Sequence, residues 1–402
     1  MRKFLLLVLY FFLLVLTSTA QEKKGRVTVI LSLDGFRWDY PEKSSTPTLN
    51  LIAEEGVKAE SLIPSFPSKT FPNHYTIATG LYPDHHGLVN NSFYDRTLNM
   101  SYAIGNKNAR FNPDFYGGEP IWITAQKQGV RTASYYWVGS DVLIQGLQPD
   151  IWKPYDGKVP FIERIDTIIK WLSLPYSERP ELVMAYYHEP DEIGHQFGPE
   201  DSRTLSLVHE LDSLTGILYE RIRQLPNGDS INFIVVSDHG MSSISSERNT
   251  VLRDYIPEKW PVRFEGGNPN FNLYVEKNYV DLVYSSLKKA KGINVWKPAE
   301  VPGHLHYGSN PRVGDIIVVA DSGWSVTEFA PDQMYTGGTH GYDIQNTDIH
   351  AIFYASGPDF KKGYFRPSFQ NIHIYSLLAH LLKIRPVETD GSFDAVKDML
   401  VY

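Results

Sequence analysis

Three apolar runs that are each followed by acidic or histidine residues constrain the fold of this chain more than any other feature. The runs span 27–33, 181–187 and 231–237, and the polar residues after them include Asp34, Asp191, His195, Asp238 and His239. Such runs, rich in β-branched residues, are typical of strands buried on both faces of a parallel sheet. Ligands of open α/β sheets bind beyond the carboxyl ends of the strands. The sequence therefore predicts a mostly parallel sheet with these polar side chains along one edge.

Helical patterns alternate with the predicted strands. Apolar residues at helical spacing indicate helices within 47–55, 160–172, 205–218 and 372–382,. This alternation predicts an α/β fold, a central sheet with helices on both faces. Residues from about 250 to 330 break the rhythm with many Pro, Gly and Asn residues, which predicts a small inserted cap subdomain,. A chain of 402 residues, 42% of them hydrophobic, can bury a large core, and its length allows one large α/β domain or two smaller ones,. We expect a single domain at 21–402.

The first twenty residues have the layout of an export signal. Arg2 and Lys3 precede an apolar run over 4–16, and small residues at 18–20 precede Gln21. This order predicts a cleavable signal peptide at 1–20, and the short apolar run disfavours the alternative of a membrane anchor. We expect an exported protein, periplasmic or secreted, with no transmembrane segment after cleavage. The sequence has no cysteine, so we expect no disulfides.

The charge distribution limits the class of partner. The net charge is -8, from 38 Lys and Arg against 46 Asp and Glu, and no basic run is present. A protein that binds nucleic acid as a polyanion needs such a run or patch. We therefore expect no stable nucleic-acid partner, and any nucleotide that the protein binds should be small.

The segment 66–87 reads F-P-S-K-T-F-P-N-H-Y-T-I-A-T-G-L-Y-P-D-H-H-G and contains one hydroxyl residue in a special position. Thr70 lies two residues before Pro72, and 72–79 has the pattern of a short helix that Gly80 ends. Backbone N–H groups at a helix N-terminus stabilise an alkoxide or a phosphate. The alternative is that Thr70 only caps the helix.

The polar residues at the strand ends form a ligand set for metal ions. Three carboxylates and three imidazoles with no thiol suit Zn²⁺ or related divalent ions, and six ligands suggest two ions. Two ions together stabilise the attacking and leaving oxygens of an in-line displacement, and an ion on Thr70 would lower the pKa of its hydroxyl. The six are Asp34, Asp191, His195, Asp238, His239 and His340, the last within a glycine-rich segment at 337–341.

Other polar residues have a simpler explanation from the sequence. His304 and His306 are two residues apart, but an exposed or core-satisfied pair is favoured over a pair of metal ligands,. Asn90 and Asn91 are consistent with ordinary turn residues.

Six segments together resemble the nucleotide pyrophosphatase/phosphodiesterase family of the alkaline phosphatase superfamily. They occur in the family's order and span about 26 to 385, nearly the whole chain after the predicted signal. Each segment alone is weak evidence, but six in register are strong. They are L-S-L-D-G-F-R (31–37), P-S-K-T-F-P-N-H-Y (67–75), T-G-L-Y-P-D-H-H-G (79–87), E-P-D-E-I-G-H-Q-F-G-P (189–199), S-D-H-G-M (237–241) and G-G-T-H-G-Y (337–342).

The resemblance implies roles for named residues. Thr70 would be the nucleophile and form a phospho-threonine, and Asn91 would donate a hydrogen bond to a phosphate oxygen. Phe71 and Tyr155 would hold the base between their rings. Two Zn²⁺ ions are implied, one bound by Asp191, His195 and His340, and the other by Asp34, Asp238, His239 and the Thr70 oxygen.

The resemblance implies an alkaline-phosphatase-like fold and an activity that hydrolyses nucleotide diesters or pyrophosphates to nucleoside 5′-monophosphates. A phosphomonoesterase and a lipid or choline-phosphate diesterase on the same scaffold remain alternatives, and a non-catalytic binding protein is a remote one. A sulfatase is disfavoured because the formylglycine of sulfatases commonly derives from cysteine. The sequence shows neither the cysteine-rich modules nor the nuclease-like appendage of animal members, so we do not expect functions attached to those parts.

Overall fold

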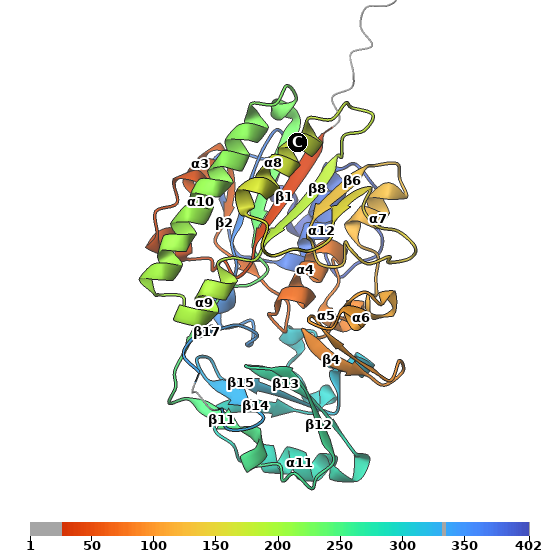
Figure 1. Cartoon of the computed structure of the whole chain (residues 1–402), viewed down its shortest axis with the longest axis vertical. Coiled ribbons are helices and arrows are strands. Elements are labelled where there is room, and N and C mark those ends of the chain that lie inside the picture. The colour runs from red at the N-terminus through yellow and green to blue at the C-terminus, as the bar shows by residue number, and fades with distance from the viewer. Residues whose placement is uncertain (1–25, 332–334, 402) are drawn as a thin grey trace, which may run out of the picture.

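A computed structural model describes residues 26–331 and 335–401 of the chain (Figure 1). The predicted signal peptide at 1–20 lies outside these residues. Among the described residues, no helix has both the length and the apolar character needed to cross a membrane.

Eight strands within the described part of the chain form the main sheet. Their order across the sheet is β19-β2-β18-β9-β1-β8-β6-β7. In chain order the strands are β1 (Val27–Leu33), β2 (Gly56–Ala59), β6 (Thr132–Tyr135), β7 (Ile151–Lys153), β8 (Leu182–Tyr187), β9 (Ile231–Val236), β18 (Phe353–Ser356) and β19 (Tyr364–Arg366).

The three predicted strands are the centre of this sheet. β1 pairs in parallel with β8 on one side, with Leu33 opposite Tyr187, and with β9 on the other, with Ser32 opposite Val236. β18 runs antiparallel to both of its neighbours, β9 and β2, and the remaining pairs are parallel. The prediction of a mostly parallel sheet is therefore confirmed, and the carboxyl ends of β1, β8 and β9 lie side by side.

Alternation along β1 explains why helices cover both faces of the sheet. Val29 and Leu31 point into a core with α3 (Pro47–Glu55), α8 (Phe161–Leu172) and α10 (Ser202–Arg223). Ile30 points into a second core, which contains residues of α4 (Thr70–Thr79), α7 (Ile121–Gln126) and α12 (Ile374–Leu381). Successive side chains of a strand face opposite sides, so one apolar strand supports both layers (Figure 1),.

Shorter elements connect these layers. The remaining α-helices are α2 (Tyr40–Lys43), α5 (Pro83–His86), α6 (Lys107–Arg110), α9 (Asp191–Phe197) and α11 (Val280–Leu287). Pairs of short strands are β3 (Leu62–Ile63) with β20 (Phe369–Gln370), β4 (Ser92–Asp95) with β5 (Met100–Ala103), β10 (Ser242–Ile244) with β17 (Gly337–Thr339), and β11 (Asn249–Val251) with β16 (Ser325–Thr327).

A second, antiparallel sheet lies in the region where the sequence predicts a cap. Its order is β12-β13-β15-β14, and we call it the cap sheet: β12 (Val262–Gly267), β13 (Asn270–Val275), β14 (Ile293–Trp296) and β15 (Ile316–Ala320). Leu273, Val283 and Val318 are fully buried between this sheet and α11 or the neighbouring loops. Figure 1 shows the cap sheet beyond α4 and α5, at the end of the molecule opposite the top of β1.

Two predicted elements begin elsewhere than expected. The helix predicted at 72–79 begins at Thr70 and ends, as expected, before Gly80, which has a left-handed conformation with φ of 68°. The apolar residues at 349–355 also predict a strand, but this strand begins only at Phe353,. A short 3₁₀ turn occupies 347–349, so the apolar run there starts before the strand does.

The N-terminus of α3 gives a test of how the helix layer is held. Thr46, its N-cap residue, makes no side-chain capping bond. Instead the buried carboxylate of Asp212, on α10, accepts hydrogen bonds of 2.9 Å from the backbone N–H groups of Thr48 and Leu49. Asp212→Ala should lower the free energy of unfolding by about 1–3 kcal/mol, because a buried donor on Leu49 and a partly buried one on Thr48 lose their acceptor,. Urea denaturation measures this.

The matched control for this variant is Glu54→Ala, which truncates an exposed acid on α3 itself. It should change the free energy of unfolding by less than about 0.5 kcal/mol. Equal losses in the two variants would show that the Asp212 contacts do not stabilise the helix.

Candidate active site

The ends of the three central strands bring the predicted polar residues to one place. Asp34 directly follows β1, and Asp238 and His239 lie just after β9. Asp191 and His195 lie one turn apart on α9, which follows β8. His340 follows β17, which contacts α9.

The six side chains form two groups, and within each group the ligand atoms all lie within 4.8 Å of one another. In the first group, His239 Nε2 is 3.0 Å from Asp238 Oδ2 and 3.5 Å from Asp34 Oδ1. The rings of His239 and His340 are stacked with centroids 3.5 Å apart, so the two groups adjoin. Within the other group, Asp191 Oδ1 is 3.5 Å from His340 Nε2, and Asp191 Oδ2 is 3.5 Å from His195 Nε2.

All three histidines present the same nitrogen to the site. Nδ1 of His195, His239 and His340 lies 2.9, 3.0 and 2.7 Å from the backbone oxygens of Gly338, Gly240 and Ser68 respectively. A carbonyl oxygen only accepts, so each Nδ1 carries the proton and donates it. When the ring is neutral, each Nε2 is then left with a lone pair, the arrangement in which histidine binds a metal.

The carboxylate oxygens show whether the site suits a metal ion. Asp34 Oδ1, Asp191 Oδ1 and Asp238 Oδ2 are buried and accept no hydrogen bond from any described residue. The other oxygen of Asp34 accepts a 2.6 Å bond from the Tyr186 hydroxyl. Buried carboxylate oxygens are normally hydrogen-bonded, and these three lie beside histidine Nε2 atoms. Both groups therefore fit a divalent cation.

The site's charges interact strongly in the absence of a cation. Burial raises the pKa of Asp34 well above its usual range, and the charges of Asp238 and Asp191 act in the same direction. Burial acts to raise the pKa of Asp238 too, but His239 and His74 hold it well below its usual range. Clustered carboxylates repel one another, and positive charge between them would relieve this repulsion.

Thr70 is the first residue of α4 and adjoins the first group. Its Oγ1 is 3.3 Å from His239 Nε2. Lys69 is the N-cap residue, so the alternative that Thr70 caps the helix is wrong. The hydroxyl is therefore placed at the helix N-terminus without being used as a cap.

Asn91 lies beside the start of the same helix. Its side-chain oxygen accepts a 3.1 Å hydrogen bond from the backbone N–H of Phe71. The amide orientation is thereby set, and the NH₂ group makes no hydrogen bond to another described residue. It remains available as a donor next to Thr70.

A cleft of about 440 Å³ connects these residues with the two predicted aromatic rings. Thr70, Phe71 and Tyr155 line it, together with Asp34 and Asp191. Tyr155 is 43% exposed, so this ring is not part of the core. The structure thus brings Phe71 and Tyr155 to the same cleft as Thr70.

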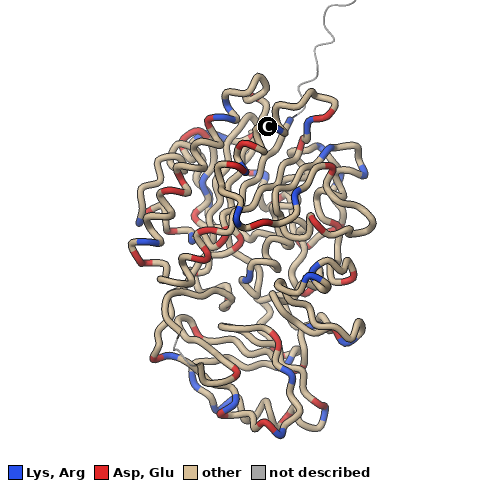
Figure 2. Tube along the Cα trace, viewed as in Figure 1, with Lys and Arg blue, Asp and Glu red and all other residues tan. Residues whose placement is uncertain are grey.

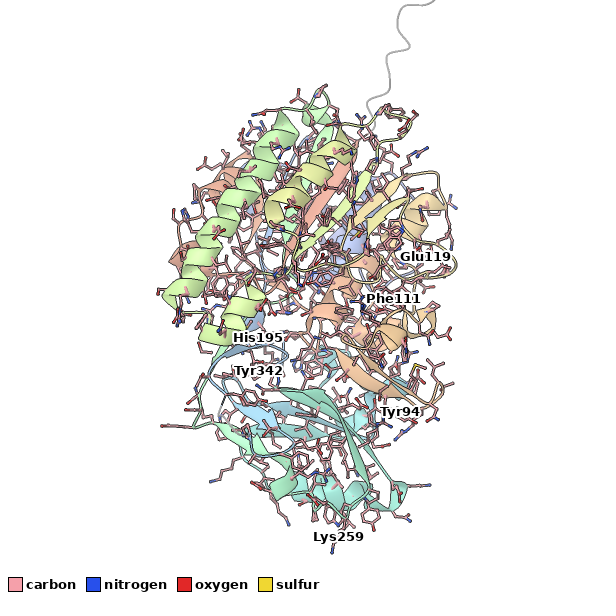
Figure 3. All side chains as sticks on the ribbon, in the orientation of Figure 1. Tyr94, Phe111, Glu119, His195, Lys259 and Tyr342 are labelled. Carbon is pink, nitrogen blue, oxygen red and sulfur yellow. The ribbon has the colours of Figure 1, made fainter. Side chains whose placement is uncertain are left out.

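Close backbone approaches explain the glycines before His340. A Cβ atom on Gly337 would lie 2.2 Å from the backbone oxygen of His195, and one on Gly338 would lie 2.7 Å from that of Gly194. Only glycine allows β17 to lie this close to α9. Figure 3 shows His195 and Tyr342 where the main sheet's part of the molecule meets the cap sheet.

His304 and His306, the two other histidines considered from the sequence, belong to none of the candidate metal groups among the described residues. His304 Nε2 is 3.0 Å from Asp343 Oδ1, and the ring of His306 stacks on that of Tyr82 with centroids 4.1 Å apart. These contacts agree with the expectation that neither is a ligand.

Sequence reasoning missed several residues that contact the site. His74 is fully buried and lies between Thr70 O, at 3.0 Å, and Asp238 Oδ2, at 3.3 Å. Its position four residues after Thr70, one helical turn, was a usable signal. Tyr186, which donates to Asp34, had no such signal. A further cluster of His188, Glu189 and Glu192 adjoins Asp191 and was not predicted.

The chain is similar to known phosphodiesterases. A family model described as type I phosphodiesterase / nucleotide pyrophosphatase matches residues 28–343. Venom phosphodiesterase CdcPDE of Crotalus durissus collilineatus is 36% identical over 384 residues, 92% of this chain and 46% of that protein. Ectonucleotide pyrophosphatase/phosphodiesterase family member 3 of Rattus norvegicus is also 36% identical over 384 residues, 92% of this chain and 44% of that protein. The chain thus spans less than half the length of these relatives.

A solved structure resembles nearly the whole chain. It is murine ectonucleotide pyrophosphatase/phosphodiesterase 5, an inactive form in complex with AMP. The TM-score is 0.89 and the identity 34%, over 94% of this chain and 100% of that chain.

Cation binding at the two groups can be measured without any substrate. Adding Zn²⁺ to the chelator-treated protein should raise its thermal midpoint, because an ion bound only by the folded state adds about 2.7 kcal/mol at 100 times its Kd. His340→Ala should reduce this rise, since it removes a buried ligand atom, whereas His306→Ala should preserve it. Differential scanning calorimetry with and without Zn²⁺ checks both variants. A full rise in His340→Ala would contradict a cation site there.

Proposed function

Because the chain belongs to the type I phosphodiesterase / nucleotide pyrophosphatase family, we propose that it hydrolyses phosphodiester or pyrophosphate bonds of small nucleotides and releases nucleoside 5′-monophosphates. The observation that carries this proposal is the shared cleft, in which Thr70 and the carboxylates lie with the rings of Phe71 and Tyr155. A structure similar to this chain has AMP bound, which supports a nucleotide as the occupant.

Thr70 is the proposed nucleophile. Its oxygen attacks the phosphorus while the hydroxyl proton passes to solvent, the bond to the leaving group breaks with its electron pair going to the leaving oxygen, and a phospho-threonine forms. The position at the start of α4 supports this role, because the helix N-terminus favours negative charge on the attacking oxygen,. Water then attacks the phosphorus, the bond to Thr70 breaks, and the nucleoside 5′-monophosphate leaves.

Two Zn²⁺ ions are the proposed cofactors. The family is metal-dependent, and the ligand groups described above support two sites. Asp191, His195 and His340 would hold one ion, while Asp34, Asp238, His239 and the Thr70 oxygen would hold the other. When bound, the ions supply positive charge that stabilises the charge developing on the phosphoryl oxygens.

Protein groups complete the stabilisation and hold the substrate. The free NH₂ group of Asn91 donates a hydrogen bond to a non-bridging phosphate oxygen. Tyr186 and His74 keep the carboxylates of Asp34 and Asp238 in place through the contacts described above. Phe71 and Tyr155 stack on the base, a contact that every base offers.

The proposal extends to the organisation and location of the protein. Residues 21–402 would form one catalytic domain with an inserted cap at about 250–330, which the separate cap sheet supports. The signal-like sequence at 1–20 and relatives named as venom and ectonucleotide enzymes support export to the periplasm or the exterior. Figure 2 shows acidic and basic residues interspersed along the described chain, which supports small nucleotides rather than nucleic acid as partners.

The decisive test compares three substrates with and without chelator. We expect kcat/KM for p-nitrophenyl thymidine 5′-monophosphate to exceed that for bis-(p-nitrophenyl) phosphate and for p-nitrophenyl phosphate, and chelator to abolish all three activities. Tyr155→Ala should raise KM for the thymidine diester about tenfold, since a stacked base contributes about 1–3 kcal/mol. The same variant should spare the diester that has no base.

Other outcomes select the alternatives. A preference for p-nitrophenyl phosphate would make the protein a phosphomonoesterase, and no turnover by the metal-loaded protein would indicate a binding protein. Equal losses on both diesters in Tyr155→Ala would mean that Tyr155 has a structural role.

Thr70→Ala tests the covalent step. It removes the attacking oxygen, but three other proposed ligands of the same ion, Asp34, Asp238 and His239, remain. Turnover should therefore fall by at least about 10³-fold while the fold and zinc content stay intact. Steady-state kinetics with zinc analysis and circular dichroism measure this. The matched control is Thr97→Ala on the exposed β4–β5 turn, which should keep full activity. Near-full activity in Thr70→Ala would contradict a phospho-threonine intermediate.

A further inference from the structure

The turn between β12 and β13 contacts the loops that carry the proposed site residues. We take this turn together with the adjoining ends of the two strands, as residues 266–270 of the cap sheet, about 200 positions after Thr70 in the sequence. Its hydrogen bonds reach residues directly beside Thr70, Asn91 and His340. The cap sheet is therefore connected to three site residues by one short segment.

Asn91 has such a contact on both sides. On one side, Asn90 donates from Nδ2 to Asn270 Oδ1 at 2.7 Å. On the other side, Ser92 Oγ accepts a 3.0 Å hydrogen bond from the Gly266 N–H and lies 3.2 Å from Gly266 O. The backbone of Asn91 is thus held between two contacts with the same turn.

The side chain of Asn270 connects Asn90 to the loop that contains His340. Its Nδ2 donates a 2.6 Å hydrogen bond to the backbone oxygen of Gly341. At the other end, Asn90 Oδ1 accepts a 2.8 Å bond from the Asn91 N–H. One chain of amides therefore runs from the Asn91 backbone through Asn90 and Asn270 to the residue after His340.

The third contact reaches the start of α4. Lys69, which precedes Thr70, donates from Nζ to the backbone oxygen of Asn268 at 2.7 Å and is only 7% exposed. The side chain of Asn268 is itself fixed inside the cap region, where its Oδ1 accepts from the Val326 N–H at 3.0 Å. Lys69 therefore binds to an ordered part of the turn.

The packing around Gly341 leaves no space for a side chain at this position. Its φ is +119°, and a Cβ atom there would lie 2.6 Å from Asn270 Nδ2 and 2.6 Å from Lys69 Cε. Asn90 and Asn270 are both 2% exposed, so water does not replace a lost bond easily,. The amide chain and Lys69 thus meet at the residue beside His340.

We propose that Asn270 is a positioning residue, which fixes Asn91 and His340 relative to each other through Asn90 and Gly341. In this view the β12–β13 turn supports the proposed site residues from behind. The kinetic side of this inference rests on the proposed function, whereas its metal-binding side does not. Groups that orient ligands from behind typically contribute about 10- to 100-fold in metal affinity or activity.

The experiment uses two variants of the whole chain. Asn270→Ala removes both bonds of the amide chain, and Asn270→Asp keeps the acceptor for Asn90 but loses the donor to Gly341. We expect Asn270→Ala to lower kcat for p-nitrophenyl thymidine 5′-monophosphate about 10- to 100-fold with little change in KM, because the base-binding rings are untouched. Zn²⁺ affinity, measured by competition with a chromophoric chelator, should fall in both variants.

Asn272→Ala is the matched control. Asn272 lies on β13, is also 2% exposed, and donates to the Tyr307 hydroxyl at 2.9 Å, which itself donates to the backbone oxygen of Val89. None of its hydrogen bonds reaches Asn90 or Gly341 directly. Its replacement should lower the thermal midpoint but leave kcat and Zn²⁺ affinity near wild type. All measurements are made well below the unfolding temperature of each variant.

A double variant adds an internal test. Because Asn90 and Asn270 act in one chain, Asn90→Ala combined with Asn270→Ala should lose little more kcat than the larger single loss. Unchanged kcat and Zn²⁺ affinity in Asn270→Ala, or equal losses in Asn272→Ala, would overturn the proposal. If the wild type turns over no diester, the proposed function fails, and the Zn²⁺ affinities alone decide on Asn270.

Discussion

The constraint on which the structure depends is the burial of one carboxylate oxygen from each of three aspartates at one edge of the main sheet. Asp34, Asp191 and Asp238 each keep an oxygen that accepts no hydrogen bond from the described residues. Leaving such atoms buried is unfavourable unless a cation neutralises them. The parallel register of β8, β1 and β9 makes their convergence unavoidable, because it places the carboxyl ends of the three strands together. The histidines, with Nδ1 bound to carbonyl oxygens, complete a set of candidate metal ligands whose rings are already oriented.

Much of the fold and of the candidate site follows from short-range sequence patterns, and these parts are the ones that the sequence predicts. β1 is an apolar run that ends in Asp34, so both its burial and the place of its acid are visible within eight residues. The helix spacing of Asp191 and His195 is likewise short-range. Even the correction to α4 is small, since the helix begins at Thr70, two residues early, with Lys69 as its N-cap. For the same reason the helices on both faces and the mostly parallel sheet follow from periodicity.

Features that depend on distant pairing were beyond sequence reasoning. Nothing local shows that β18 runs antiparallel to β9, since one apolar strand serves either direction. The Tyr186 hydroxyl reaches Asp34 across 152 positions. The amide of Asn270 reaches Gly341 across 71 positions. An asparagine in a region rich in turns has many local uses, so its sequence context does not identify a long-range partner.

The need for such distant contacts follows from the glycines around His340. Gly337 and Gly338 must be glycine for the backbone to approach α9, but glycine loses more conformational entropy on folding than any other residue,. A loop of this composition does not hold a ligand in one place by itself. His340 is held from one side by the carbonyl oxygen of Ser68, which precedes Lys69, and the next residue, Gly341, is held from the other by Asn270. The glycines that let β17 approach α9 thus also make the segment around His340 more flexible, and the hydrogen bond from Asn270 of the cap sheet restrains that segment.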